Sequence, residues 1–408
     1  MLHTLCIGVN ATVGSGVFAL PDDMQRAMGG YSPLAYLLCA LVLLPVTLCF
    51  VELSSRIDET GGSYIYALRA FGPRIGFVTG WFCLIANLVS WAANATLFVD
   101  LLGFHGATGH LIAALLVIFL GAINYYGIKP GAWLIILMTA GKLAAIACFL
   151  GVAAGRLDLS RLGGSLPHGA WGVGSGVYLA LFPLQGFETT PIAAGETENS
   201  RQIVPLATLG TLLFSTLLFM IVQAALVCAY PALATPSSHP LVDAARSFGV
   251  QLGAIVLAGS ILATGGFSAG CALGSPRYAE AMAQHEMLPP WLAARHPRRD
   301  TPHRSIIVIT GLTAVMALFF DYRRLVGMSN ITVVTQYVMT CLAVPYLRKE
   351  PSQGQGQAKP WTIPGGAVIP VVGALGSLIL LSGADRTETL FAAVTLLAGL
   401  AVMFWRRR

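Results

Sequence analysis

The sequence predicts an all-α protein that crosses a membrane many times. Its 408 residues are 56% hydrophobic and only 10% charged, whereas about a quarter of the residues in a soluble domain are charged. Apolar stretches of about 20 residues, the length that spans a bilayer, recur along the whole chain. Because lipid offers no partner to a free backbone group, each of these stretches must be helical.

Twelve such stretches can be read along the chain. They are residues 2–20, 31–51, 75–99, 111–128, 130–155, 171–187, 206–228, 247–276, 305–320, 325–347, 367–383 and 389–405. The longest connector, 278–304, is basic and Pro-rich and predicts a short amphipathic helix followed by a link, and 352–359 is a polar linker. The chain therefore forms a single transmembrane domain over residues 1–408.

Basic residues in the short loops indicate the orientation, because loops rich in Lys and Arg stay on the cytoplasmic side. With the N-terminus inside, sixteen of the 24 Lys and Arg residues lie in inner loops or the C-terminal tail, seven lie in outer loops, and Lys142 lies within a span. This bias predicts a protein of the cell (inner) membrane with both termini in the cytoplasm.

The rest of the composition argues against several functions. The eight cysteines lie in or beside apolar stretches and form no CxxC pair, which is typical of small buried side chains. The histidines lack metal-ligand spacing, and no basic run with interleaved aromatics predicts nucleic-acid binding. We therefore expect no metal, no cofactor and no enzyme activity. The first segment lacks the basic start of a signal peptide, and an upstream start codon stays open.

Residues that disfavour a helix interrupt two of the spans. Gly14, Ser15 and Gly16 interrupt the first, and residues 182–188, Phe-Pro-Leu-Gln-Gly-Phe-Glu, interrupt the sixth. Within a membrane such breaks persist only where the freed backbone is buried or lines a cavity. Glycines that simply allow close helix packing are the alternative for the first break, and the matching second break disfavours it.

The breaks lie five spans apart, so the two halves of the chain would run in opposite senses. This is the arrangement of an inverted repeat with a substrate site at the breaks. A broken helix offers N–H groups to a carboxylate and C=O groups to an ammonium, and Ser15 adds a hydroxyl. The pattern therefore predicts a site for a zwitterion such as an amino acid.

Several short motifs appear in one order along nearly the whole chain. They are GSGVF at 14–18, GGSYIY at 61–66 with Phe71-Gly72, GFE at 186–188, GETENS at 195–200 with IVP at 203–205, and RYAEAMA at 277–283 followed by Leu288-Pro289 and Thr301-Pro302. With these motifs the sequence resembles the amino acid–polyamine–organocation permeases. It departs from them at Asn199-Ser200, where the family usually has Asn-Pro.

The resemblance implies a LeuT-type fold and amino acid transport by alternating access. Residues 1–155 and 170–348 would be the inverted repeats, with two further spans at about 364–406. By position, the resemblance implies that Thr12, Gly14, Ser15 and Gly16 contact the α-amino and α-carboxylate groups of the substrate. It implies that Phe182 is an aromatic gate. It also places Gln185, Gly186 and Phe187 at the site, where the carbonyls of Phe182 and Gln185 would hold the ammonium.

Lys142 lies in the middle of the fifth span. A charge at this depth is costly and usually faces a partner within the bundle. By the resemblance, Lys142 takes the place of a sodium ion in related sodium-coupled transporters. We expect it to bridge the broken first span to the eighth, where Thr264 and Ser268 lie one turn apart, or to release a proton. A lysine that reaches water near a helix end is the alternative.

Acidic residues are rare within the spans. Glu188 is the candidate for gating or proton coupling, and a purely structural cap on the broken helix is its alternative. Glu52 and Glu196 lie near the cytoplasmic ends of their spans, where a surface charge is the simpler interpretation. Because a cationic side chain would require a further deep carboxylate, we expect a neutral substrate.

Polar residues in two other spans are candidates for a side-chain pocket. Asn87, Trp91 and Asn94 share one face of the third span, and Ser329, Asn330 and Thr332 open the tenth. Polar packing between helices explains both groups equally well.

These observations favour a proton-coupled symporter or an exchanger of a neutral amino acid. An amino acid exporter or a cationic amino acid or polyamine antiporter is the alternative within transport, and a transporter-like sensor that moves nothing is the alternative of another class. The expected partners are an amino acid, protons and the lipid bilayer; the oligomeric state stays open.

Overall fold

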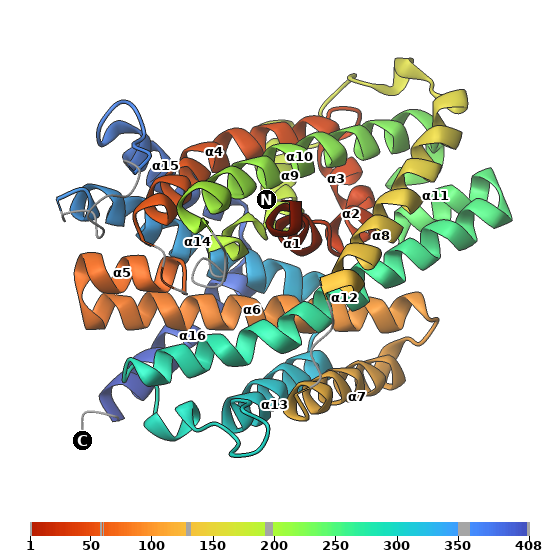
Figure 1. The fold of residues 1–408 in the computed structure, drawn as a ribbon. Coiled ribbons are helices and arrows are strands. Elements are labelled where there is room, and N and C mark those ends of the chain that lie inside the picture. The colour runs from red at the N-terminus through yellow and green to blue at the C-terminus, as the bar shows by residue number, and fades with distance from the viewer. Residues whose placement is uncertain are drawn as a thin grey trace.

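The computed structural model describes residues 2–57, 59, 61–127, 132–191, 199–349 and 360–405. These residues form helices and no strand; Figure 1 shows their arrangement. In chain order the helices are α1 Leu2–Thr12, α2 Gly16–Ala19, α3 Pro21–Met28, α4 Pro33–Arg56, α5 Ser63–Phe71, α6 Pro73–Leu101, α7 Gly106–Tyr125, α8 Ala132–Ala153, α9 Gly169–Leu184, α10 Ser200–Ala229, α11 Pro240–Phe248, α12 Val250–Gln284, α13 His303–Phe319, α14 Tyr322–Leu347, α15 Val368–Leu380 and α16 Arg386–Trp405. Short 3-10 helices include η3 Phe187–Thr189 and η6 Pro290–Ala293.

The predicted class, an all-α polytopic membrane protein, is confirmed. Helices long and apolar enough to cross a membrane are α4, α6, α7, α8, α10, α12, α14 and α16, and α13 and α15 are shorter apolar helices. The two remaining expected spans are the broken ones, which correspond to α1 with α2 and to α9 with η3.

The structure differs from the expected spans in the connectors. Helix α12 continues to Gln284, eight residues past the expected end at 276, with Pro276 inside it. The connector beyond it contains η6 rather than a longer amphipathic helix. Among the described residues, three short helices were not expected, α3, α5 and α11, because each has only eight or nine residues and contains charged side chains. Of these, α5 and α11 lie at opposite ends of the molecule (Figure 1).

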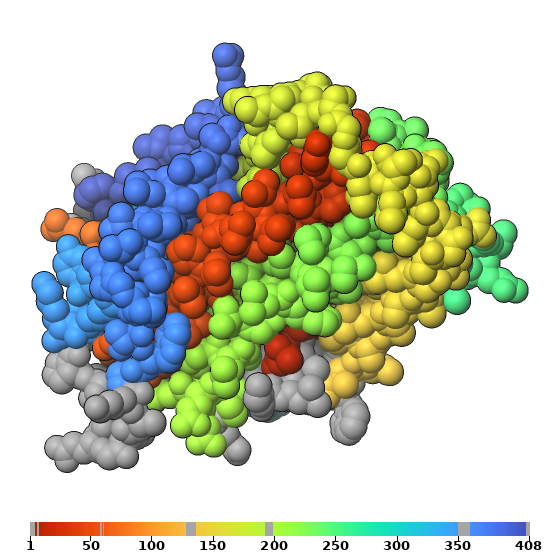
Figure 2. All heavy atoms as spheres, turned by 90° about the horizontal axis from the view of Figure 1, so that it is seen from above, coloured from red at the N-terminus to blue at the C-terminus, as the bar shows by residue number. Residues whose placement is uncertain are grey.

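The positions of the helices follow their side chains. Helix α6, in the middle of the bundle, is almost wholly buried, and it packs against α5, α7, α12, α13 and α14. Helices α15, α4, α10 and α8 follow one another across one face (Figure 2). Their outward leucines, such as Leu41 (57% exposed) and Leu213 (54% exposed), are apolar where lipid would contact them.

Glu52 is not a surface charge. Its side chain is fully buried, and Arg348 at the end of α14 donates to both of its oxygens at 2.7 Å. Arg56 and the Ile363 N–H donate to the same carboxylate at 3.2 and 2.9 Å. The ion pair therefore joins α4, α14 and the segment before α15. Glu196, the rest of the 195–198 motif and the linker 352–359 lie outside the described residues.

Candidate functional site

The first break separates α1 from α2. Helix α1 ends at Thr12, and the Gly14 N–H turns back to the Thr12 carbonyl at 2.8 Å. At Gly16 a Cβ would lie 2.5 Å from Pro183 Cγ and 2.9 Å from Pro183 Cα. Because real Cβ contacts are essentially never this short, the close approach to Pro183 requires glycine.

The second break follows α9. Pro183 supplies no N–H, the helix ends at Leu184, and Gly186 has a φ of +121° that disfavours other residues. A Cβ at Gly186 would lie 2.7 Å from the Thr12 nitrogen. The two breaks therefore contact each other at two points, Gly16 with Pro183 and Gly186 with Thr12.

Lys142 holds the first break in place. Its side chain on α8 is fully buried, and Nζ donates to the Asn10 carbonyl at 3.0 Å, to Asn10 Oδ1 at 2.9 Å and to the Val13 carbonyl at 2.7 Å. Three donors thus meet three acceptors, all on α1 and its break. This arrangement suits a buried ammonium, which must be fully hydrogen-bonded.

The expected bridge from Lys142 to α12 is not present among the hydrogen bonds of the described residues. Thr264 Oγ1 donates to the Ser260 carbonyl within its own helix, and the buried Ser268 hydroxyl has no partner among the described residues. Sequence reasoning missed Asn10 as a partner of Lys142, although an amide side chain inside an apolar run was an available signal.

Glu188 lies in η3, directly after the second break. Its Oε2 accepts from the Gly186 N–H at 2.9 Å and from the Tyr337 hydroxyl at 3.2 Å. The neighbouring Phe187 ring stacks on Tyr337 with centroids 5.5 Å apart and meets Phe50 edge-on. Glu188 therefore caps the break and ties it to α14, while it also borders the cavity described next.

A small inner cavity lies at the two breaks. Its volume, by the positions open to the centre of a water molecule, is about 50 Å³. The lining residues are Ala11, Thr12, Gly14, Ser15, Gly16, Ala86, Asn87, Ser90, Asn94, Phe182, Pro183, Gln185, Gly186, Glu188, Thr189, Phe267, Val333 and Gln336. Sequence reasoning did not single out several of these lining residues, because nothing local marks which face of a buried helix meets a cavity; they are Ala11, Ala86, Ser90, Thr189, Phe267, Val333 and Gln336.

Other candidate residues lie behind the residues that line the cavity. They are buried close to the breaks without lining it, and they are Phe187, Lys142, Thr264 and Ser268. Of the candidates for a side-chain pocket, Asn87 and Asn94 line the cavity, whereas Trp91, Ser329, Asn330 and Thr332 do not.

Ser329 and Asn330 instead belong to a polar chain between helices. Ser90 and Ser329 share a hydrogen bond of 2.7 Å, Ser329 donates to Gln185 Oε1 at 3.0 Å, and Gln185 Nε2 donates to Asn330 Oδ1 at 2.7 Å. Asn330 then donates to the Tyr178 carbonyl at 2.8 Å. These hydrogen bonds join α6, α9 and α14 beside the cavity and so fix the position of the Gln185 side chain.

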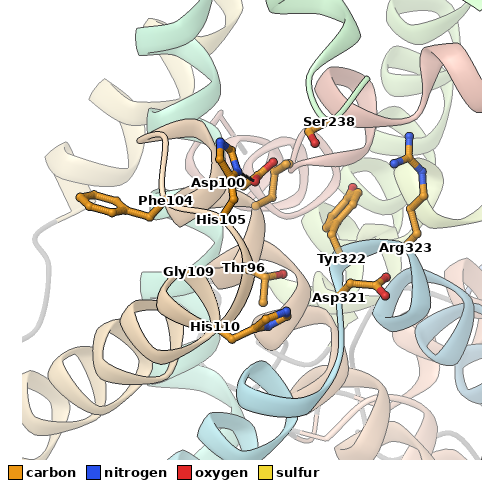
Figure 3. Close-up of a pocket in the computed structure, with 12 residues that line it drawn as sticks. Thr96, Asp100, Phe104, His105, Gly109, His110, Ser238, Asp321, Tyr322 and Arg323 are labelled. Atoms are coloured by element: carbon orange, nitrogen blue, oxygen red, sulfur yellow. Dashed lines mark hydrogen bonds and ion pairs between the residues drawn. The ribbon is translucent and has the colours of Figure 1, made fainter. Parts of the chain in front are cut away.

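A larger outer cavity of about 420 Å³ opens at the α11 end of the bundle (Figure 3). Its charged groups already pair with one another or with near neighbours. His105 and His239 both contact the Asp100 carboxylate, and Arg323 contacts Asp22 and Asp23. The inner cavity, in contrast, has the unengaged groups that a polar ligand requires.

Two buried hydrogen-bonding atoms at the inner cavity have no partner within the described residues. They are Ser15 Oγ and Asn94 Oδ1, and both residues line the cavity. Leaving such atoms unpaired costs about 1–3 kcal/mol each, so a polar ligand would complete the site. A helical membrane protein with a cavity at two touching helix breaks has the architecture of a secondary transporter.

Comparison with known proteins gives the family. Residues 1–403 match the model of the amino acid permease family, and the chain belongs to it. The serine/threonine exchanger SteT of Bacillus subtilis is 28% identical, over 98% of this chain and 94% of the relative. The branched-chain amino acid permease BcaP of the same organism is 25% identical, over 98% and 90%. The vacuolar cationic amino acid transporter 4 of Arabidopsis thaliana is 25% identical, over 86% and 63%.

Proposed function

We propose that this permease transports a small neutral amino acid by alternating access, through exchange or proton symport, with the inner cavity as its substrate site. The observation that carries the proposal is the direct contact of the two breaks, Gly16 with Pro183 and Gly186 with Thr12. A substrate held between them contacts both halves of the chain, so its binding can bias how the halves sit against each other.

The two breaks offer the groups that an amino acid needs. The carboxylate is assigned to the segment of Thr12, Gly14, Ser15 and Gly16, where the Ser15 hydroxyl is unengaged. The ammonium is assigned to the carbonyls of Phe182 and Gln185 at the second break. Gly186 and Phe187 are assigned to fixing the conformation of that break. Phe182 also covers the cavity and acts as its aromatic gate.

The lining favours a small neutral side chain. Glu188 is the one ionisable residue among the lining residues, and its Oε2 already accepts two hydrogen bonds. Ala86, Asn87 and Ser90 on α6 leave a small, mildly polar space. The exchange of serine and threonine by SteT, a relative along nearly the whole chain, supports the same substrate class.

Lys142 and Glu188 are assigned to coupling, because they are the charged groups that contact the two breaks directly. Residues 1–155 and 170–348 are proposed as the inverted repeats, followed by two spans at about 364–406. The basic end of the bundle, which holds α5, is proposed to face the cytoplasm of an inner-membrane protein, with both termini on that side.

Counterflow in proteoliposomes tests the proposal. Vesicles are loaded with a mixture of amino acids, and labelled alanine, serine, threonine, valine, lysine, arginine and putrescine are offered outside, with and without a pH gradient. Uptake confined to the small neutral amino acids is expected, and a response to the gradient separates symport from exchange. Uptake of lysine, arginine or putrescine alone would replace the neutral substrate by a cationic one. No uptake by folded protein would favour a sensor.

A further inference from the structure

Tyr322 separates the outer cavity from the inner one. Its side chain lines the outer cavity beside Asp321 and Arg323 (Figure 3). Its ring also meets Phe182, which lines the inner cavity, edge-on with centroids 6.2 Å apart and planes at 88°. At this point, therefore, the wall between the outer and inner cavities is a single pair of aromatic rings, Tyr322 and Phe182.

The Tyr322 hydroxyl is buried beside the Ser15 hydroxyl at the first break. Neither hydroxyl has a hydrogen-bond partner within the described residues, and neither is accessible to solvent. Proteins rarely leave buried hydroxyls unpaired, because each loses its hydrogen bonds to water without replacement. Even if one hydroxyl donates to the other, a pair of hydroxyls leaves one O–H without an acceptor, and we infer that this acceptor is supplied from the inner cavity.

The residue after Tyr322 ties the same turn of α14 to α3. Arg323 Nε donates to Asp23 at 2.7 Å, and its terminal nitrogen donates to Asp22 at 3.1 Å and to the Ser237 carbonyl at 3.0 Å. Helix α3 directly follows the break that contains Ser15. A ligand that holds Tyr322 beside Ser15 therefore also holds Arg323 in its contacts with the two aspartates.

We propose that Tyr322 recognises the substrate carboxylate together with Ser15, and that this hydrogen bond closes the outer side of the site through Arg323. The inference rests on the proposed function, since the carboxylate is that of the amino acid. An ionised oxygen is the acceptor that two hydroxyl donors hold most strongly. A substrate analogue without this charge would bind without closing the wall.

Binding to the purified full-length protein in nanodiscs tests this. The ligands are L-alanine, L-serine and L-valine, each beside its carboxamide, which keeps the ammonium and the side chain but loses the negative charge. Tyr322→Phe keeps the ring contact with Phe182 and removes the donor. Tyr346→Phe, at the exposed far end of α14, is the matched control.

For Tyr322→Phe we expect the dissociation constant of the amino acid to rise about tenfold, with less than about a twofold change for its carboxamide. Tyr346→Phe should change neither. Hydrogen exchange over 20–28, which the amino acid should slow in the wild type, should stay fast with the amide and in Tyr322→Phe. An equal loss for acid and amide, or no loss, would overturn the role of Tyr322 alone. Absence of any amino acid binding by the wild type would overturn the proposed function and this inference with it.

Discussion

Substitution of Gly16 tests whether the contact between the two breaks creates the site. In Gly16→Ala the added Cβ would lie 2.5 Å from Pro183 Cγ and 2.9 Å from its Cα. Pro183 is a rigid ring within the last turn of α9, so it cannot rotate away as a flexible side chain would. The two breaks must separate to accommodate the methyl group.

The expected cost follows from the overlap. Forcing one extra carbon into a well-packed interior costs about 1–3 kcal/mol, which corresponds to a loss of amino acid affinity of about 5-fold to 150-fold if the strain falls on the bound state. Binding of the small neutral amino acids is measured by calorimetry or by labelled ligand, and thermal unfolding in the same detergent reports the cost to the fold.

Gly151→Ala is the matched control for this test. Gly151 lies within α8, and a Cβ there would meet nothing within 4 Å. That substitution should leave binding unchanged and raise stability slightly, by about 0.5–1 kcal/mol, because alanine favours a helix. Unchanged affinity and unchanged unfolding temperature in Gly16→Ala would refute the proposed contact between the breaks.

Three further substitutions probe the charged groups. Lys142→Met should lower the free energy of unfolding by about 3 kcal/mol in a denaturant titration, because three acceptors on α1 and its break lose their donor; an unchanged midpoint would contradict the role of Lys142 as the bridge. Glu188→Gln keeps an oxygen for the Gly186 N–H but cannot exchange a proton, so the fold should persist while the pH dependence of transport flattens; a profile like that of the wild type would leave Glu188 as a cap alone. Arg348→Met should cost about 3 kcal/mol by leaving the buried Glu52 underpaired. Glu52 raises the pKa of Arg348 above its ordinary value, so this contribution is fully present at neutral pH and is lost only as the pH rises through that raised pKa. The difference in stability between the wild type and Arg348→Met should therefore be constant between about pH 6 and 9, and a marked slope in that window would contradict it.

The sequence by itself determined the class of protein and the location of the breaks. Apolar stretches of bilayer length require helices, and glycine and proline interrupt helices wherever they occur, so both features are local. The helix ends at Thr12 and Leu184 agree with the breaks read from residues 14–16 and 182–188. The short motifs indicated the family to which the match over residues 1–403 assigns the chain.

Only the tertiary structure decided which side chains meet. Lys142 was expected to bridge the first span to Thr264 and Ser268. Within the described residues its hydrogen bonds reach only the first-span side, at Asn10 and Val13, because the packing of α8 against α1 and α12 decides which partners the side chain meets. Glu52 has the sequence context of a surface charge but is buried by Arg348, almost three hundred residues away in sequence, at 2.7 Å. Tyr322 and Ser15 lie more than three hundred residues apart in sequence, so no local pattern places one hydroxyl beside the other. Helix periodicity fixes which residues share a face, and packing alone fixes what that face contacts.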